Sequence, residues 1–269
     1  MPDFDSILIV GCGNMAGAML EGWLAAGLDP ARFTVSDPMA RVLPAGVRRL
    51  EAVPQGETFD AILLGVKPQL LGEVAPQVGP LAGAGTTLFS ILAGVELAVL
   101  ETRFPQAGAI VRLMPNLSAA LGKSPIALAS RRLDQAGQDA ATALLAPLGT
   151  PEWIAEEAFD LVTALAGSGP AFVYRFIDAL AQAAAELGLP REQAARLALA
   201  MVDGAAALAA ASPHDPGELA RRVASPGGVT QAGLDAIDRG GALGSLVEAT
   251  LRAARDRSAQ MAAEARAKG

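Results

Sequence analysis

The feature that most constrains this chain is a run of aliphatic residues that leads into a glycine-rich turn. Residues 7–10 read Ile-Leu-Ile-Val, and residues 11–17 read Gly-Cys-Gly-Asn-Met-Ala-Gly. Consecutive aliphatic residues are typical of a buried strand in a parallel sheet, and residues 15–26 have apolar positions at helical spacing. A strand, a tight glycine turn and a helix in this order predict the first unit of a dinucleotide-binding domain.

The small residues of this turn have expected roles. Gly11 permits the turn, Gly13 lets a pyrophosphate approach the backbone, and Ala16 or Gly17 allows the helix to pack closely on the strand. Backbone amides at the helix N-terminus, aided by the helix dipole, then bind the phosphates. Cys12 is expected to serve as a small residue rather than a redox thiol, because no basic side chain flanks it.

Further strands that alternate with helices predict a mostly parallel sheet and an α/β fold of the Rossmann type. The expected strands are 33–36, 60–66, 86–92, 110–114, 126–129 and 153–155, with helices from Leu70, Glu96 and Asp134 onwards. The carboxyl ends of parallel strands share one edge, where ligands of such sheets bind. Lys67, Ala93 and Asn116 are therefore expected on a common rim.

Asp37 ends the second expected strand and allows two interpretations. A carboxylate there can accept from the adenosine ribose hydroxyls, which favours NAD, or it can be a cap or turn residue ahead of Pro38. Ser36 and Arg41 could instead hold a 2′-phosphate. The preference between NADH and NADPH therefore stays open.

After about Glu157, alanine-rich helices replace the strands. We expect a dinucleotide-binding domain over residues 1–160 and a helical dimerisation and substrate domain over 161–269, with long helices at 170–186, 191–211 and 241–268. The first of these helices is apolar almost all round, so neighbouring elements must cover most of it. This predicts an obligate homodimer, with a closed monomeric bundle as the alternative.

Composition excludes several classes of function. A net charge of −7 without a Lys/Arg cluster argues against nucleic acid as a partner. One cysteine and one histidine, His214 in a Pro/Gly/Asp-rich loop, exclude an intramolecular disulfide and a Cys/His metal cluster, so no metal is expected. Prolines and glycines interrupt the longest uncharged stretch, 74–95, and residues 1–6 lack a basic residue. We therefore expect a soluble cytoplasmic protein with no membrane partner.

A second candidate site lies between the last two long helices. Residues 225–231 read Ser-Pro-Gly-Gly-Val-Thr-Gln and lead into an expected helix over 230–237. A turn that brings backbone amides and a hydroxyl to a helix N-terminus is suited to a carboxylate, but an ordinary loop with Thr230 as the cap fits the spacing equally well. A carboxylate site beside a dinucleotide site indicates hydride transfer to a small acid.

Six segments, in order along nearly the whole chain, resemble the pyrroline-5-carboxylate reductases. They are 11–15 (Gly-Cys-Gly-Asn-Met), 66–68 (Val-Lys-Pro), 90–91 (Ser-Ile) with 93–94 (Ala-Gly), 114–116 (Met-Pro-Asn), 167–171 (Gly-Ser-Gly-Pro-Ala) and 225–228 (Ser-Pro-Gly-Gly) with Thr230. The resemblance implies reduction of an imino acid, 1-pyrroline-5-carboxylate, to L-proline with NADPH or NADH, the last step of proline biosynthesis. It also implies an intertwined homodimer, which in some family members assembles into decamers.

The resemblance also implies roles for individual residues. Gly228, Val229 and Thr230 would hold the substrate, with backbone amides on its carboxylate and the catalytic Thr230 hydroxyl on its ring nitrogen. An imine can be protonated before hydride arrives, so positioning and electrostatics carry the catalysis without a histidine base. Asn116 would lie near the nicotinamide ribose, and the residues that would line the dinucleotide are Gly11, Cys12, Gly13, Asn14, Met15, Ser36, Val66, Lys67, Pro68 and Ala93.

Several positions depart from the family pattern. Leu117 and Ser118 replace the usual Thr-Pro, Ala166 replaces a common serine, Asp215 takes the place of a histidine with His214 one position early, and Val229 stands where Thr is frequent. These departures bear on substrate affinity and identity. Two alternatives therefore stay open: a reductase of another cyclic imine or small keto acid, and a non-catalytic dinucleotide-binding dimer.

Overall fold

The computed structural model describes residues 4–39 and 42–268, and these form two compact units. Unit 1 comprises the described residues up to Ser168 together with those from Ala253 onwards, and unit 2 is Gly169–Arg252. The end of the last helix thus belongs to unit 1, whereas the expected division, 1–160 and 161–269, assigns it to the helical domain. That division stays a prediction about domains.

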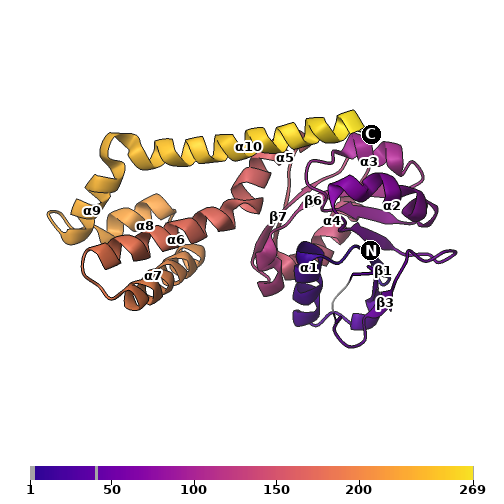
Figure 1. Cartoon of the computed structure of the whole chain (residues 1–269), viewed down its shortest axis with the longest axis horizontal. Helices are drawn as coiled ribbons and strands as arrows, with labels where there is room; N and C mark the ends of the chain where they lie inside the picture. Colours follow the sequence, from indigo (N-terminus) through magenta and orange to yellow (C-terminus); the bar gives the residue numbers. More distant parts are fainter. Residues whose placement is uncertain (1–3, 40–41, 269) are drawn as a thin grey trace. The chain divides into compact units, whose positions relative to one another are not determined.

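Unit 1 is built on one sheet (Figure 1), and its strand order is β3-β2-β1-β4-β5-β6-β7-β8. Neighbouring strands are parallel except for the antiparallel pair β6 and β7. The predicted mostly parallel sheet is therefore confirmed. The strands are β1 (Ile7–Val10), β2 (Phe33–Ser36), β3 (Arg48–Leu50), β4 (Ala61–Leu64), β5 (Thr87–Ser90), β6 (Ala109–Met114), β7 (Ser124–Ala129) and β8 (Gly149–Trp153).

Helices cover both faces of this sheet. Ile7 and Ile9 of β1 enter one hydrophobic core and Leu8 and Val10 the other, because successive side chains of a strand point to opposite faces. Burial on both faces explains why β1 reads as a continuous apolar run. The α-helices of the first part of unit 1 are α1 (Asn14–Ala25), α2 (Leu71–Val78), α3 (Leu97–Arg103), α4 (Gln135–Leu145) and α5 (Phe159–Val162).

Unit 2 is helical. Its helices are α6 (Gly169–Glu186), α7 (Arg191–Ala211), α8 (Pro216–Val223), α9 (Val229–Asp238) and the first part of α10 (Ala242–Lys268). Helix α7 has the predicted bounds, whereas α8 was not predicted. Its start is nevertheless marked in the sequence: Asp215 caps the helix by accepting from the amide of Glu218 at 3.0 Å, and Pro216 occupies the first turn.

Candidate functional site

The predicted common rim of the sheet is confirmed by the strand register. Val10, Leu64, Ser90 and Arg112 of four parallel neighbours, β1, β4, β5 and β6, lie in one row across the sheet. The segments that follow these strands therefore leave the sheet at the same edge. They carry Gly11, Lys67, Ala93 and Asn116, the residues that the sequence places there.

The glycine turn after β1 is held by backbone contacts that only glycine permits. Gly11 has φ +83°, and its amide donates to the carbonyl oxygen of Ser36 at 2.9 Å. A Cβ atom at Gly11 would lie 2.7 Å from Cγ1 of Val66, closer than real contacts allow. Gly13 is the N-cap of α1, so the first amides of this helix are donors without an intrahelical acceptor.

Close packing between α1 and the sheet depends on Ala16 rather than Gly17. Ala16 is buried, whereas a Cβ atom at Gly17 would meet open space. Gly65, which the sequence analysis did not single out, completes this contact: its Cβ would lie 2.8 Å from that of Ala16 and 2.3 Å from the carbonyl oxygen of Gly11. Its signal in the sequence is a glycine directly after a buried strand.

Asp37 acts as a turn residue that fixes the glycine loop. Oδ2 of Asp37 accepts from the amide of Cys12 at 2.7 Å, and Oδ1 accepts from the amide of Met39 at 2.8 Å. Each carboxylate oxygen keeps a further lone pair, so a ribose contact stays a prediction. Ser36 is buried at the end of β2, and Arg41, the other candidate for a 2′-phosphate, lies outside the described residues.

Cys12 has an inert thiol. Burial, with smaller contributions from the nearby carboxylates of Asp37 and Glu21, raises the pKa of Cys12 to about 11. The thiol is therefore protonated at neutral pH, and the thiolate that redox chemistry needs is scarce. This supports the interpretation of Cys12 as a small residue of the turn.

Asn116 is a structural anchor at the rim. Its Nδ2 donates to the carbonyl oxygen of Ala166 at 2.9 Å, and its Oδ1 accepts from the amide of Ser118 at 2.9 Å and from the Ser118 hydroxyl at 2.5 Å. The Asn116 amide donates to Ser124 Oγ at 2.9 Å. One side-chain N–H is left for a ligand, so the expected contact with the nicotinamide ribose stays a prediction.

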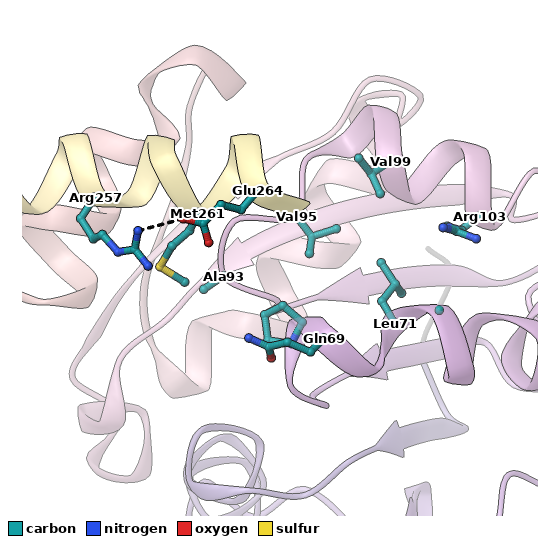
Figure 2. Close-up of a pocket in the computed structure, with 11 residues that line it drawn as sticks. Gln69, Leu71, Ala93, Val95, Val99, Arg103, Arg257, Met261 and Glu264 are labelled. Carbon is teal, nitrogen blue, oxygen red and sulfur yellow. Dashed lines mark hydrogen bonds and ion pairs between the residues drawn. The ribbon is translucent and has the colours of Figure 1, made fainter. Parts of the chain in front are cut away.

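A cavity of about 310 Å³ opens beside the rim, within unit 1. Figure 2 shows Ala93 between Gln69 and Met261, with Arg257 directed toward Glu264. Arg257 Nη1 lies 3.1 Å from Glu264 Oε1, so this ion pair borders a mostly apolar cavity. The wall that α10 supplies was not predicted from the sequence, because residues distant in the chain carry no local signal of their contact.

The end of α10 is fixed to unit 1 beside this cavity. Ser258 Oγ donates to Asp160 Oδ1 at 2.7 Å, and Arg266 forms an ion pair with Glu96. Between them, Ala262 is buried against Gly94, where a Cβ atom would lie 3.2 Å from the Ala262 nitrogen. Gly94 has φ +74°, so both conformation and space favour glycine there.

The second candidate site lies in unit 2, at the start of α9. Gly228 is the N-cap of this helix and Thr230 is an exposed residue of its first turn, so Thr230 is not the cap. The Gly228 amide donates to the carbonyl oxygen of Ser225 at 2.9 Å. The helix geometry leaves the amides of Val229 and Thr230 as donors, because the first amides of a helix have no intrahelical acceptor.

Two further observations concern classes of partner. The residues that the structure describes contain no group of three or more His, Cys, Asp or Glu placed to hold a metal ion.

By length and composition alone, α7 could span a membrane: it has 21 residues and a mean hydropathy of 1.5. A helix that packs against another protein subunit has the same composition, so this is weak evidence for a membrane.

A Rossmann-type sheet with a glycine turn at its edge, joined to a helical unit, is typical of two-domain nicotinamide-dependent oxidoreductases. The family model "NADP oxidoreductase coenzyme F420-dependent" matches residues 6–94, and "Pyrroline-5-carboxylate reductase dimerisation" matches residues 156–261. The chain belongs to the pyrroline-5-carboxylate reductase family.

Relatives over nearly the whole chain support this assignment. Pyrroline-5-carboxylate reductase of Pseudomonas aeruginosa is 37% identical, over 95% of this chain and 96% of the relative. The Glycine max enzyme of that name is 34% identical, over 91% and 92%.

Solved structures agree in fold. The pyrroline-5-carboxylate reductase of Coxiella burnetii is 29% identical, with a TM-score of 0.88 and 96% and 99% of the two chains covered. The Plasmodium falciparum pyrroline carboxylate reductase, solved with NADP bound, is 25% identical, with a TM-score of 0.82 over 96% and 98%.

Proposed function

We propose that this protein reduces 1-pyrroline-5-carboxylate to L-proline with NADPH or NADH, the last step of proline biosynthesis. One observation carries the proposal: the Gly11 turn stands at the ligand-binding edge of the sheet in a chain that matches named reductases over nearly its whole length. We further propose the cytoplasm as the site of action.

The dinucleotide would lie along the rim, with its pyrophosphate over the start of α1. Free amides at Asn14 and Met15 and the positive end of the helix dipole favour phosphate there. Exposed Lys67 and the partly exposed Pro68 and Ala93 would contact the nicotinamide half. Binding of NADP to the Plasmodium falciparum relative supports this class of cofactor.

The substrate would bind at the start of α9. The amides of Val229 and Thr230 would hold the carboxylate, and the Thr230 hydroxyl would hydrogen-bond the ring nitrogen, which carries a proton. The reduced nicotinamide, when bound, supplies the hydride. Thr230 would keep the imine carbon electrophilic by stabilising the protonated C=N bond, and hydride addition to that carbon then leaves a neutral secondary amine.

We infer that the protein is a homodimer formed through unit 2, and that further assembly into a decamer is a second step. The dimerisation model that matches residues 156–261 supports association between subunits. Large apolar side chains of α7, such as Leu197 and Met201, are more than half exposed in the single chain. A second protein subunit, rather than lipid, is the proposed cover for α7.

An activity panel tests this function. Purified protein is mixed with 1-pyrroline-5-carboxylate, other cyclic imines and small keto acids, each with NADPH and with NADH, and cofactor oxidation is followed by absorbance. We expect the highest kcat/KM with 1-pyrroline-5-carboxylate. A higher value with another imine or keto acid would favour the alternative reductase, and cofactor binding without oxidation of any compound would favour a non-catalytic dimer.

A further inference from the structure

Helix α3 begins directly after the Ala93–Gly94 turn, and a distant carboxylate caps it. The amide of Leu97, the first residue of α3, donates to Oε1 of Glu156 at 2.6 Å. The N-cap residue itself, Glu96, supplies no side-chain hydrogen bond to this helix. Glu156 therefore satisfies a free amide that lies only a few residues beyond the proposed contact of Ala93 with the cofactor.

Two arginines hold Glu156 in place. Its Oε1 lies 3.5 Å from Nη1 of Arg112, and its Oε2 lies 2.7 Å from Nη2 of Arg131. Arg112 is 3% exposed, and its guanidinium carbon lies 4.0 Å from the ring centroid of Phe159. Glu156 thus connects strand β6, the segment after β7 and the start of α3.

Arg112 depends on this carboxylate. Its Nε and Nη2 atoms are buried without a hydrogen-bond partner among the described residues. Burial lowers the pKa of Arg112, and the nearby Glu156 carboxylate is the largest of the charges that oppose this shift. Removal of Glu156 would therefore leave a buried cation without its ion pair, which is strongly destabilising.

We propose that Glu156 is a positioning residue for the nicotinamide end of the cofactor site. It would act through the first turn of α3, which fixes the Ala93–Gly94 turn from one side while Ala262 of α10 packs on Gly94 from another. This inference rests on the proposed function, because it takes Ala93 as a cofactor contact.

Selective loss of nicotinamide binding tests the proposal. Dissociation constants are measured for NADPH and for adenosine 2′,5′-bisphosphate, which lacks the whole nicotinamide nucleotide, and for NADH and for ADP, which lacks nicotinamide and its ribose. Glu156→Ala should weaken binding of the intact cofactors at least about tenfold while changing fragment binding less than about twofold. Glu156→Gln keeps an acceptor for the Leu97 amide and should recover most of the loss.

Glu101→Ala is the matched control. Glu101 also pairs with Arg131, at 3.4 Å, and its side chain is 18% exposed against 14% for Glu156, but it does not cap α3. This variant should bind all four compounds like the wild type. Equal weakening of intact cofactors and fragments in Glu156→Ala, or a change in Glu101→Ala as large as that in Glu156→Ala, would overturn the proposal.

A double variant separates positioning from folding. If Glu156→Ala unfolds because Arg112 is left without its counter-ion, Arg112→Met with Glu156→Ala removes both charges while α3 still lacks its cap. The selective loss should persist in this variant, and wild-type binding of the cofactors would overturn the proposal. If wild-type protein itself binds neither NADPH nor NADH, the proposed function fails instead.

Discussion

Unit 1 and unit 2 differ in the share of their apolar side chains that is buried. In unit 1 two hydrophobic cores enclose the sheet, and strands such as β1 and β4 are buried along their whole length. Among the described residues of unit 2, the buried ones are Ala194 and Ala198, whereas large apolar side chains stay exposed, among them Val173, Tyr174, Phe176, Leu197, Leu199, Met201 and Leu208. Unit 1 therefore buries most of its large apolar side chains within itself, whereas unit 2 leaves exposed an apolar surface of the kind that a second subunit covers.

The largest expected effect concerns unit 2, the unit that leaves more of its apolar side chains exposed. Replacing both Leu197 and Met201 of α7 by Asp puts two charges on a face that we expect to be buried between subunits, so assembly should be lost. Sedimentation and light scattering should report a monomer. Hydrogen exchange should show unit 2 losing protection while β1 and β4 keep it.

Leu121→Asp is the control for this experiment. Leu121 is an equally apolar, 75% exposed residue, but it belongs to unit 1. This variant should assemble like the wild type. A double Asp variant that still assembles would show that exposed apolar side chains of α7 are not the contact surface.

The next largest effect concerns the cofactor edge of unit 1. Gly11→Ala adds a Cβ atom that overlaps Val66 and places alanine at φ +83°, so the turn must move. Backbone strain of about 1–3 kcal/mol should accompany a loss of NADPH affinity of about tenfold or more. Calorimetry measures both quantities. Gly17→Ala, where a Cβ meets open space, should leave affinity near wild type and stabilise α1 slightly.

Local sequence patterns predicted most of the strands and helices of unit 1, because burial of an element constrains the residues that it can contain. A parallel strand buried on both faces reads as a nearly continuous apolar run, so residues 7–10 could be delimited from the sequence alone, and residues 33–36 were also predicted although Thr34 and Ser36 interrupt the run. Strand β3 was missed because its residues Arg-Arg-Leu at the sheet edge carry no such run. The antiparallel direction of β7 was also missed, since apolar periodicity does not encode strand direction.

The parts of the site that were not predicted from the sequence depend on contacts between residues that are distant along the chain. The Gly11 turn and the rim follow from one motif and from strand order. Glu156 and the end of α10 reach the rim from far along the chain, and neither lies in a motif that marks it. Asn116 was predicted at the rim, but its bonds to Ala166 and Ser118 depend on a fold that brings those residues to it.

The third prediction concerns the proposed separation of functions, in which unit 1 binds the cofactor and unit 2 binds the substrate. Thr230→Ala removes the hydroxyl proposed to hydrogen-bond the ring nitrogen, so kcat should fall at least about tenfold while the dissociation constant of NADPH stays near wild type. Thr230→Ser keeps a hydroxyl and should retain most of the activity. Unchanged turnover in Thr230→Ala would remove this residue from the mechanism.

The smallest expected effect concerns the reactivity of the Cys12 thiol in unit 1. Because the pKa of Cys12 is raised from 9.0 to about 11, iodoacetamide labelling of the folded protein should keep accelerating up to about pH 11, whereas the urea-unfolded chain should level off near 9.0. A raised pKa also means that the folded state binds the proton more tightly, so this group's contribution to stability is intact below pH 9.0 and is lost as pH rises toward about 11. Mass spectrometry of the labelled protein measures the first effect, and denaturant unfolding across that range measures the second. A folded-state midpoint near 9.0 would mean that the glycine turn is open to solvent, and unit 1 would then be less tightly closed at its functional edge than at its core.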